Sequence, residues 1–148
     1  MKFWQINRDK NVRVTLSELA NCYDLSFSSH MILSDKIIAL DSAKKKLMIS
    51  DFRGTAESVC IVDLNEVKAV SLQQTYENIE AGELSKKEID EFITSIQLQF
   101  EYHNNPKKSS LLFYRRTLHV IRDLAKFRRN AKSWHMILSR LIKPVRKI

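Results

Sequence analysis

The feature that most constrains this chain is a run of apolar residues near the C-terminus, spaced for one side of an α-helix. Six of them recur at intervals of three or four positions: Leu124, Phe127, Ala131, Trp134, Leu138 and Leu141. Such spacing gathers them into a single stripe, which Ile137 and Ile142 widen. Pro144 follows the stripe. We therefore predict a long amphipathic helix that packs its stripe on a core and ends at Pro144.

Before this helix, the apolar pattern has the period of β-strands. Residues 96–102 alternate strictly between apolar and polar side chains, which is typical of a strand with one buried face. Further runs that are rich in apolar and β-branched residues occupy residues 36–40, 46–49, 58–62, 67–76 and 110–114. We expect a polar break at residues 26–30, a turn at residues 51–57 and a helical turn at residues 85–88.

Near the N-terminus, residues 15–23 are predicted to form a short helix. Leu16, Leu19 and Tyr23 follow the spacing of one helix face. Thr15 and Glu18 match the capping-box pattern that begins many helices.

Together these segments predict an α+β fold. It consists of a small antiparallel sheet, or partly open barrel, of about six to seven strands, with the short N-terminal helix and the long C-terminal amphipathic helix. We expect residues 1–32 to form an N-terminal segment and residues 33–148 the main domain, within a single globular unit. The core should include Leu98, Phe100, Phe113, Phe127, Trp134 and Leu138. With 148 residues, 44% of them hydrophobic, the chain can bury such a core without disulfides. Cys22 and Cys60 are therefore expected to be buried thiols in a reducing compartment.

Basic charge is concentrated in the last part of the chain. The net charge is +8, yet residues 115–148 alone contribute +10, because they hold eleven Lys or Arg and the single acid Asp123. Residues 1–114 therefore contribute −2. Such asymmetry bears on partners more than on fold. We interpret the chain as a non-catalytic intracellular binding or scaffolding module at the inner membrane surface, whose partner is the anionic membrane or a protein.

The residues expected to contact a membrane or another polyanion are Arg115, Arg116, Arg128, Arg129 and Lys132, with Lys44, Lys45 and Lys46 in the first predicted hairpin. Two alternatives stay open for the same charge. The first is a nucleic-acid-binding domain that uses the basic C-terminal segment, with Phe113 and Tyr114 as stacking surfaces beside the arginines. It ranks lower because the glycine-aromatic signature of an RNA-recognition sheet is absent. The second is a protein–protein adaptor whose basic face only keeps it soluble.

No combination of residues indicates an enzyme. Gly54 and Gly82 are the only glycines, so the chain has no phosphate-binding glycine loop. The four histidines share no ligand spacing with one another or with the cysteines, so no metal site is expected. Glu88, Asp90 and Glu91 lie close together in a polar stretch, which is typical of a solvated face. We therefore expect neither catalysis nor a cofactor.

The order of short antiparallel strands and one long amphipathic helix resembles that of a pleckstrin-homology-like domain. Residues 60–70 (CIVDLNEVKAV) resemble the middle strands of bacterial domains of that superfold. The run with Trp134 resembles the helix that closes the open end of the barrel in such domains. This resemblance covers roughly residues 33–142 and implies a PH-like fold.

A narrower resemblance concerns residues 33–47 (LSDKIIALDSAKKKL), 63–67 (DLNEV) and 81–84 (AGEL). They are similar to an uncharacterised family of bacterial proteins with one N-terminal transmembrane helix and a cytosolic domain. The resemblance implies a cytoplasmic location, or one at the cytosolic face of the inner membrane through an anchor outside this chain, since no apolar run here reaches roughly 20 residues. Phe3 and Trp4, with basic residues after them, suit the cytosolic flank of such a helix; an ordinary N-terminus fits equally well.

Overall fold

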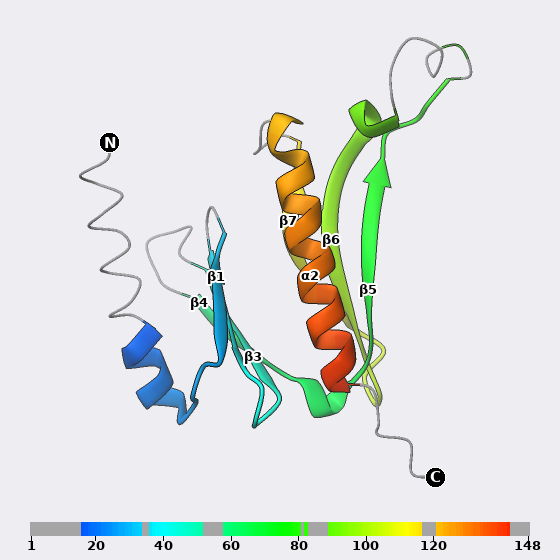
Figure 1. The fold of residues 1–148 in the computed structure, drawn as a ribbon. Helices are drawn as coiled ribbons and strands as arrows, with labels where there is room; N and C mark the ends of the chain where they lie inside the picture. The colour runs from blue at the N-terminus through cyan, green and yellow to red at the C-terminus, as the bar shows by residue number, and fades with distance from the viewer. Residues whose placement is uncertain are drawn as a thin grey trace, which may run out of the picture. The chain divides into compact units, whose positions relative to one another are not determined.

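The computed structural model describes residues 16–33, 36–51, 58–80, 82, 89–116 and 121–142. The chain divides into two compact units, residues 1–63 and residues 64–148. Among the described residues, seven strands form two antiparallel sheets, four strands in the first unit and three in the second (Figure 1). A short helix precedes the first sheet and a 19-residue helix follows the second. The predicted α+β class is therefore confirmed.

The first unit is a four-stranded meander. Its strands, each hydrogen-bonded to the next, are β1 (Ser29–Ile32), β2 (Lys36–Asp41), β3 (Lys46–Asp51) and β4 (Ser58–Asp63). The helix at residues 16–23 supplies Leu16 to a buried cluster with Ile37, Ala39 and Met48. Ala39 and Met48 lie opposite one another in the ladder, so they point to the same face of the sheet. This helix therefore stabilises the sheet by covering that face.

Strand β1 was not expected from the sequence, which suggested a polar break at residues 26–30. Its Ser29 lies opposite Leu40 and its Ile32 opposite Ile37, in register with β2. The segment is only four residues long, and its sequence SHMI has little strand character of its own. The hydrogen bonds to β2 hold this segment in an extended conformation that its own sequence does not favour. The expected boundary between residues 32 and 33 consequently falls within this sheet.

Asp41 organises the turn between β2 and β3. The residue is 1% exposed, and its carboxylate accepts hydrogen bonds from the backbone N–H groups of Ser26 (2.8 Å) and Lys44 (3.0 Å). These bonds, that of Ser26 first, lower the pKa of Asp41 below its ordinary value of 3.8, because they favour the ionised form. In the same turn Lys44 Nζ lies 3.1 Å from Asp24 Oδ2, and Lys45 has a φ of 55°.

The second unit begins with a short 3-10 helix, Leu64–Glu66, and its sheet has longer strands. They are β5 (Val67–Tyr76), β6 (Ile93–Tyr102) and β7 (Lys108–Arg115), paired in that order. The predicted alternation in β6 is confirmed, because Ile96, Leu98 and Phe100 are buried and the residues between them are half-buried. Another 3-10 helix, Ile89–Phe92, leads directly into β6.

A β-bulge in β7 changes which side chains reach the core. Ile96 pairs with Tyr114, but the next residue, Gln97, pairs with Leu112, so Phe113 has no residue opposite it. An extra residue breaks the alternation of a strand. Phe113 and Tyr114 are consequently both buried, at 2% and 0% exposure. The tyrosine packs against Phe127, with ring centroids 6.2 Å apart.

The helix α2 (Leu124–Ile142) packs against all three strands of this sheet. Its buried residues are Leu124, Ala131, Trp134 and Leu138, which belong to the predicted stripe. Phe127 is half-buried. Ile137 is 39% exposed and does not widen the buried stripe, contrary to expectation. It lies at the margin of the helix, where the stripe turns towards solvent.

The expectation of buried thiols is wrong. Cys22 and Cys60 are both exposed, and neither forms a disulfide. Cys22 lies outside the i, i+3, i+4, i+7 set of its helix, and Cys60 lies on β4, a strand at the edge of its sheet. Several expected features lie outside the described residues: Thr15, the turn at 52–57, the helical turn at 85–88, Pro144, and Phe3 with Trp4.

Candidate functional site

The exposed side of α2 carries basic side chains. Its sequence contains five basic residues and no acidic one. Four of the five are exposed, and we call them the basic face: Lys126, Arg129, Lys132 and Arg140. Within the described ranges, none of the four forms an ion pair with a carboxylate. The apolar stripe packs against the sheet, so the basic face lies on the other side of the helix.

Arg128, by contrast, points into the second unit. Its guanidinium makes two hydrogen bonds to the Asp90 carboxylate, at 2.8 and 3.1 Å, and its Nε donates to Gln74 Oε1 at 3.1 Å. The Arg128 fork lowers the pKa of Asp90, and the carboxylate in turn raises the pKa of Arg128. Sequence analysis grouped Arg128 with the polyanion-binding residues. Its bidentate pairing gives it a structural task, because it ties α2 to β5 and to the segment before β6.

Arg115 and Arg116, the other predicted cations of this unit, lie at the end of β7. Arg116 Nη1 lies 2.9 Å from Glu77 Oε2, and Nη2 donates to the carbonyl of Glu91. Arg115 is exposed and also interacts with other residues. The aromatic residues before them are buried, so Phe113 and Tyr114 do not offer ring faces for base stacking, contrary to that alternative.

The predicted lysines Lys44, Lys45 and Lys46 lie in the first unit, at the turn after β2. Lys44 pairs with Asp24, and Lys46 lies opposite both Asp41 and Asp63 in the ladders of the sheet. Each of these lysines thus has a carboxylate nearby or a backbone role in the turn. The surface around these lysines therefore also carries acidic residues, whereas α2 contains none.

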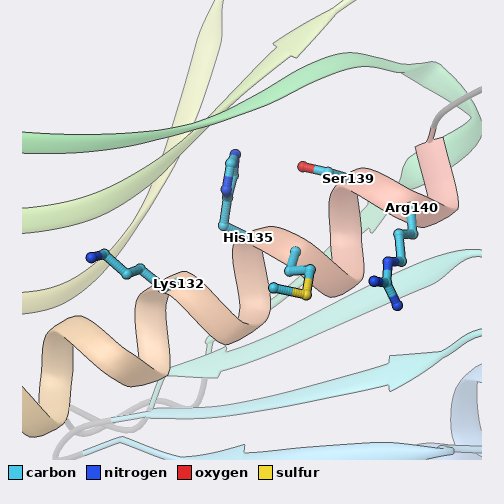
Figure 2. A pocket seen from close by; sticks show the side chains of 5 residues that line it. Lys132, His135, Ser139 and Arg140 are labelled. Atoms are coloured by element: carbon cyan, nitrogen blue, oxygen red, sulfur yellow. The ribbon is translucent and has the colours of Figure 1, made fainter.

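A hollow of about 410 Å³ runs along one flank of α2. It is lined by Lys132, His135, Met136, Ser139 and Arg140, all of which belong to α2 (Figure 2). The His135 Nε2 lies 2.9 Å from the carbonyl oxygen of Val70 and donates to it. Figure 2 shows Lys132 and Arg140 leaving the helix in different directions. Their charged ends do not converge on one point, as a clamp for a single phosphate would require.

Exposed apolar residues accompany the basic face. Met136 is 55% exposed and Ile137 39% exposed. The sequence-based prediction named neither as part of a site. Met136 could have been found from the spacing alone, because it lies four residues from both Lys132 and Arg140 and therefore between them on the helix.

A second hollow, of about 430 Å³, lies beside the turn between β6 and β7. It is lined by Asn65, Glu66, Tyr102, His103, Asn104 and Asn105. These side chains include no lysine or arginine, so this hollow is unrelated to the basic face. Across the part of the chain that the structure describes, no three or more His, Cys, Asp or Glu side chains gather in a way that could hold a metal ion.

Comparison with known proteins adds no relative. No protein-family model matches the sequence, and no curated protein or solved structure is significantly similar to it. Of the helices in the described ranges, none is both long enough and apolar enough to cross a membrane.

Proposed function

We propose that this protein is a non-catalytic binding or scaffolding module that adsorbs to an anionic membrane surface through the basic face of α2. The observation that carries the proposal is the distribution of charge on this helix. Its apolar side is used for folding, one arginine is used for internal pairing, and the four exposed cations have no acidic neighbour on the helix. The proposed location is cytoplasmic, at the inner surface of the membrane.

The distribution of charge favours an extended anionic surface as the binding partner over a small anionic ligand. Four cations spread along α2 present charge over an extended area, and each basic residue near an anionic leaflet contributes about 1 kcal/mol of attraction. Basic helices that carry exposed apolar residues are typical of interfacial binding. Met136 and Ile137 supply that apolar part. Nucleic acid would use the same charge, but the burial of Phe113 and Tyr114 removes the stacking surface that favoured it.

We also propose that the architecture is pleckstrin-homology-like. A four-stranded antiparallel meander, a three-stranded antiparallel meander and a C-terminal helix follow one another along the chain. This order resembles that of such domains, in which short antiparallel strands are followed by one long amphipathic helix. It supports a binding module, because these folds present surfaces and loops on a rigid sheet scaffold.

Co-sedimentation with lipid vesicles tests the function. The protein should be retained by vesicles containing phosphatidylglycerol and not by phosphatidylcholine alone, at physiological salt. The triple variant Lys126→Gln/Arg129→Gln/Lys132→Gln should lower the partition coefficient on the order of a hundredfold. Arg128 is left intact, because its replacement would disturb the attachment of α2.

A matched control removes the same charge elsewhere in the second unit. Lys68, Lys107 and Lys108 are all exposed, and their replacement by glutamine should leave retention close to that of the wild type. Equal losses in the two triple variants would mean that only net charge matters, which contradicts a dedicated face. A DNA duplex and a single strand, run in parallel, reveal the nucleic-acid alternative if they retain the protein and the vesicles do not.

A further inference from the structure

Met136 occupies the middle of the basic face. Residues four positions apart lie above one another on a helix, so Lys132 and Arg140 flank Met136 on either side, and Arg129 lies seven positions before it. The residue is 55% exposed, the highest value among the exposed large hydrophobic residues of the described chain. Methionine is unbranched and flexible, which suits contact with an irregular apolar environment.

An exposed apolar side chain is common on protein surfaces and by itself indicates nothing. Ile89 provides the comparison within this molecule, because it is 53% exposed. It is followed in a 3-10 helix by Asp90, which pairs with Arg128, and by Glu91, so carboxylates lie beside it in the sequence, whereas α2 has none. Met136 has nearly the same exposure, but it lies between Lys132 and Arg140 on a helix that contains no acidic residue. Its charge environment, and not its exposure, distinguishes it.

We propose that Met136 inserts into the hydrocarbon boundary of an anionic bilayer when the basic face adsorbs, while Lys132 and Arg140 remain at the level of the lipid phosphates. This inference rests on the proposed function and deepens it, because it identifies an anionic phospholipid bilayer as the ligand. Lysine and arginine can lay their aliphatic stems along apolar surroundings and keep their charged ends in the polar layer. Their divergent directions in Figure 2 suit contacts with separate headgroups. Ile137, at the margin, would lie at the edge of the inserted area.

Salt dependence separates insertion from adsorption by charge. At about 0.5 M NaCl the Debye length is under half its value at about 0.1 M, so charge attraction weakens whereas apolar insertion does not. Met136→Ser should lower the partition coefficient roughly fivefold at both salt concentrations, as expected from the apolar surface of a half-exposed side chain. The triple charge variant should lose most of its binding at low salt and differ little from the wild type at high salt. Ile89→Ser is the matched control and should bind like the wild type.

Each outcome bears on one proposal or on both. If Met136→Ser binds like the wild type at both salt concentrations, insertion is wrong and adsorption through the basic face stands. If Ile89→Ser loses as much binding as Met136→Ser, the position of Met136 has no special role and the inference also fails. If anionic vesicles do not retain the wild type at all, the proposed function fails and the inference fails with it.

A depth measurement provides an independent readout. Cys22 and Cys60 are exposed, so both are first replaced by serine. An environment-sensitive fluorophore is then attached to Met136→Cys or, as the control, to Ile89→Cys. We expect a blue shift with anionic vesicles for the label at position 136 and none at position 89. A label at position 136 that keeps its aqueous spectrum on vesicle-bound protein would overturn the insertion.

Discussion

The two units hold their elements together by different polar contacts. In the first unit, the buried carboxylate of Asp41 accepts backbone N–H groups from two nearby loops. In the second, the partly exposed carboxylate of Asp90 receives the guanidinium of Arg128, 38 residues later in the chain. The first arrangement fixes the path of a turn, and the second fixes the position of a helix that also packs through apolar residues. A substitution should therefore have an effect that depends on whether apolar packing supports the same element.

The largest effect is expected at Trp134, where apolar packing attaches α2 to its sheet. The residue is 3% exposed. Trp134→Ala should lower the free energy of unfolding by about 3–5 kcal/mol, because it removes a large buried side chain and leaves a cavity. Urea unfolding measures the change, with Met136→Ala on the same helix as a control within about 0.5 kcal/mol of the wild type. A Trp134→Ala protein with wild-type stability would mean that α2 does not depend on this packing.

Replacement of Asp41 should have the next largest effect. Asp41→Asn weakens two hydrogen bonds to a charged acceptor in a buried site, so we expect a loss of about 2 kcal/mol at neutral pH. The control is Asp24→Asn, since the Asp24 side chain is 99% exposed and its replacement should change stability little. If both variants unfold alike, the bonds from Ser26 and Lys44 do not organise the turn.

The same carboxylates predict how stability depends on pH. The fold lowers the pKa of both Asp41 and Asp90 below 3.8, so the ionised forms stabilise it above the unfolded pKa of about 3.9. That contribution is lost as the pH falls below about 4 and through the folded pKa values. Asp41→Asn should flatten part of this acid dependence. An unchanged slope between about pH 4 and pH 2 would contradict the role assigned to this carboxylate.

A smaller effect is expected at Arg128, because apolar packing already holds the helix. Arg128→Lys keeps the charge but loses the fork that matches Asp90. The Asp90 side chain is 47% exposed, so water and salt screen the pair and the loss should be about 1 kcal/mol. Arg129→Lys, at the exposed neighbouring position, is the matched control. A loss as large as that at Trp134 would show that the ion pair, and not the apolar stripe, attaches α2.

The smallest effect should be a gain of stability in the first unit. Lys45 has a positive φ of 55°, which glycine adopts without the clash of a Cβ atom. Lys45→Gly should therefore raise the free energy of unfolding by up to about 1 kcal/mol. Lys44→Gly, one position earlier in the turn, should lower stability, because Lys44 has an ordinary φ and contacts Asp24. Opposite signs at adjacent positions are the diagnostic result.

Much of the fold was predictable because the patterns that define it are local. The alternation of residues 96–102 and the stripe of α2 both depend on neighbouring positions, and both are confirmed by burial. Strand β1 was missed because its character comes from β2, with which it pairs. The bulge at Phe113 was missed for a similar reason, because only the register of the partner strand reveals an extra residue. Features created by pairing leave little trace in the segment itself.

The sequence predicted that the candidate site is basic, but it predicted only some of the residues that form it. Helix spacing correctly places Arg129 and Lys132 on the exposed side of α2. It could not separate Arg128 from them, because the partner of Arg128 lies 38 residues away in a polar stretch without periodicity. Met136 was overlooked although the spacing places it among cations. A single apolar residue among cations forms no periodic pattern of its own, so the sequence does not mark it as part of a site.

The bulge in β7 has a consequence for changes in chain length. Deletion of Phe113, the residue between Leu112 and Tyr114, would restore regular pairing but would remove one of the two buried aromatic residues from the core. An inserted residue would shift the register of the residues after it by one position, which would turn their side chains to the other face of the sheet. Relatives of this protein should therefore tolerate substitutions among large apolar residues here more readily than they tolerate insertions or deletions. The number of residues in this strand is itself part of the information that specifies the core.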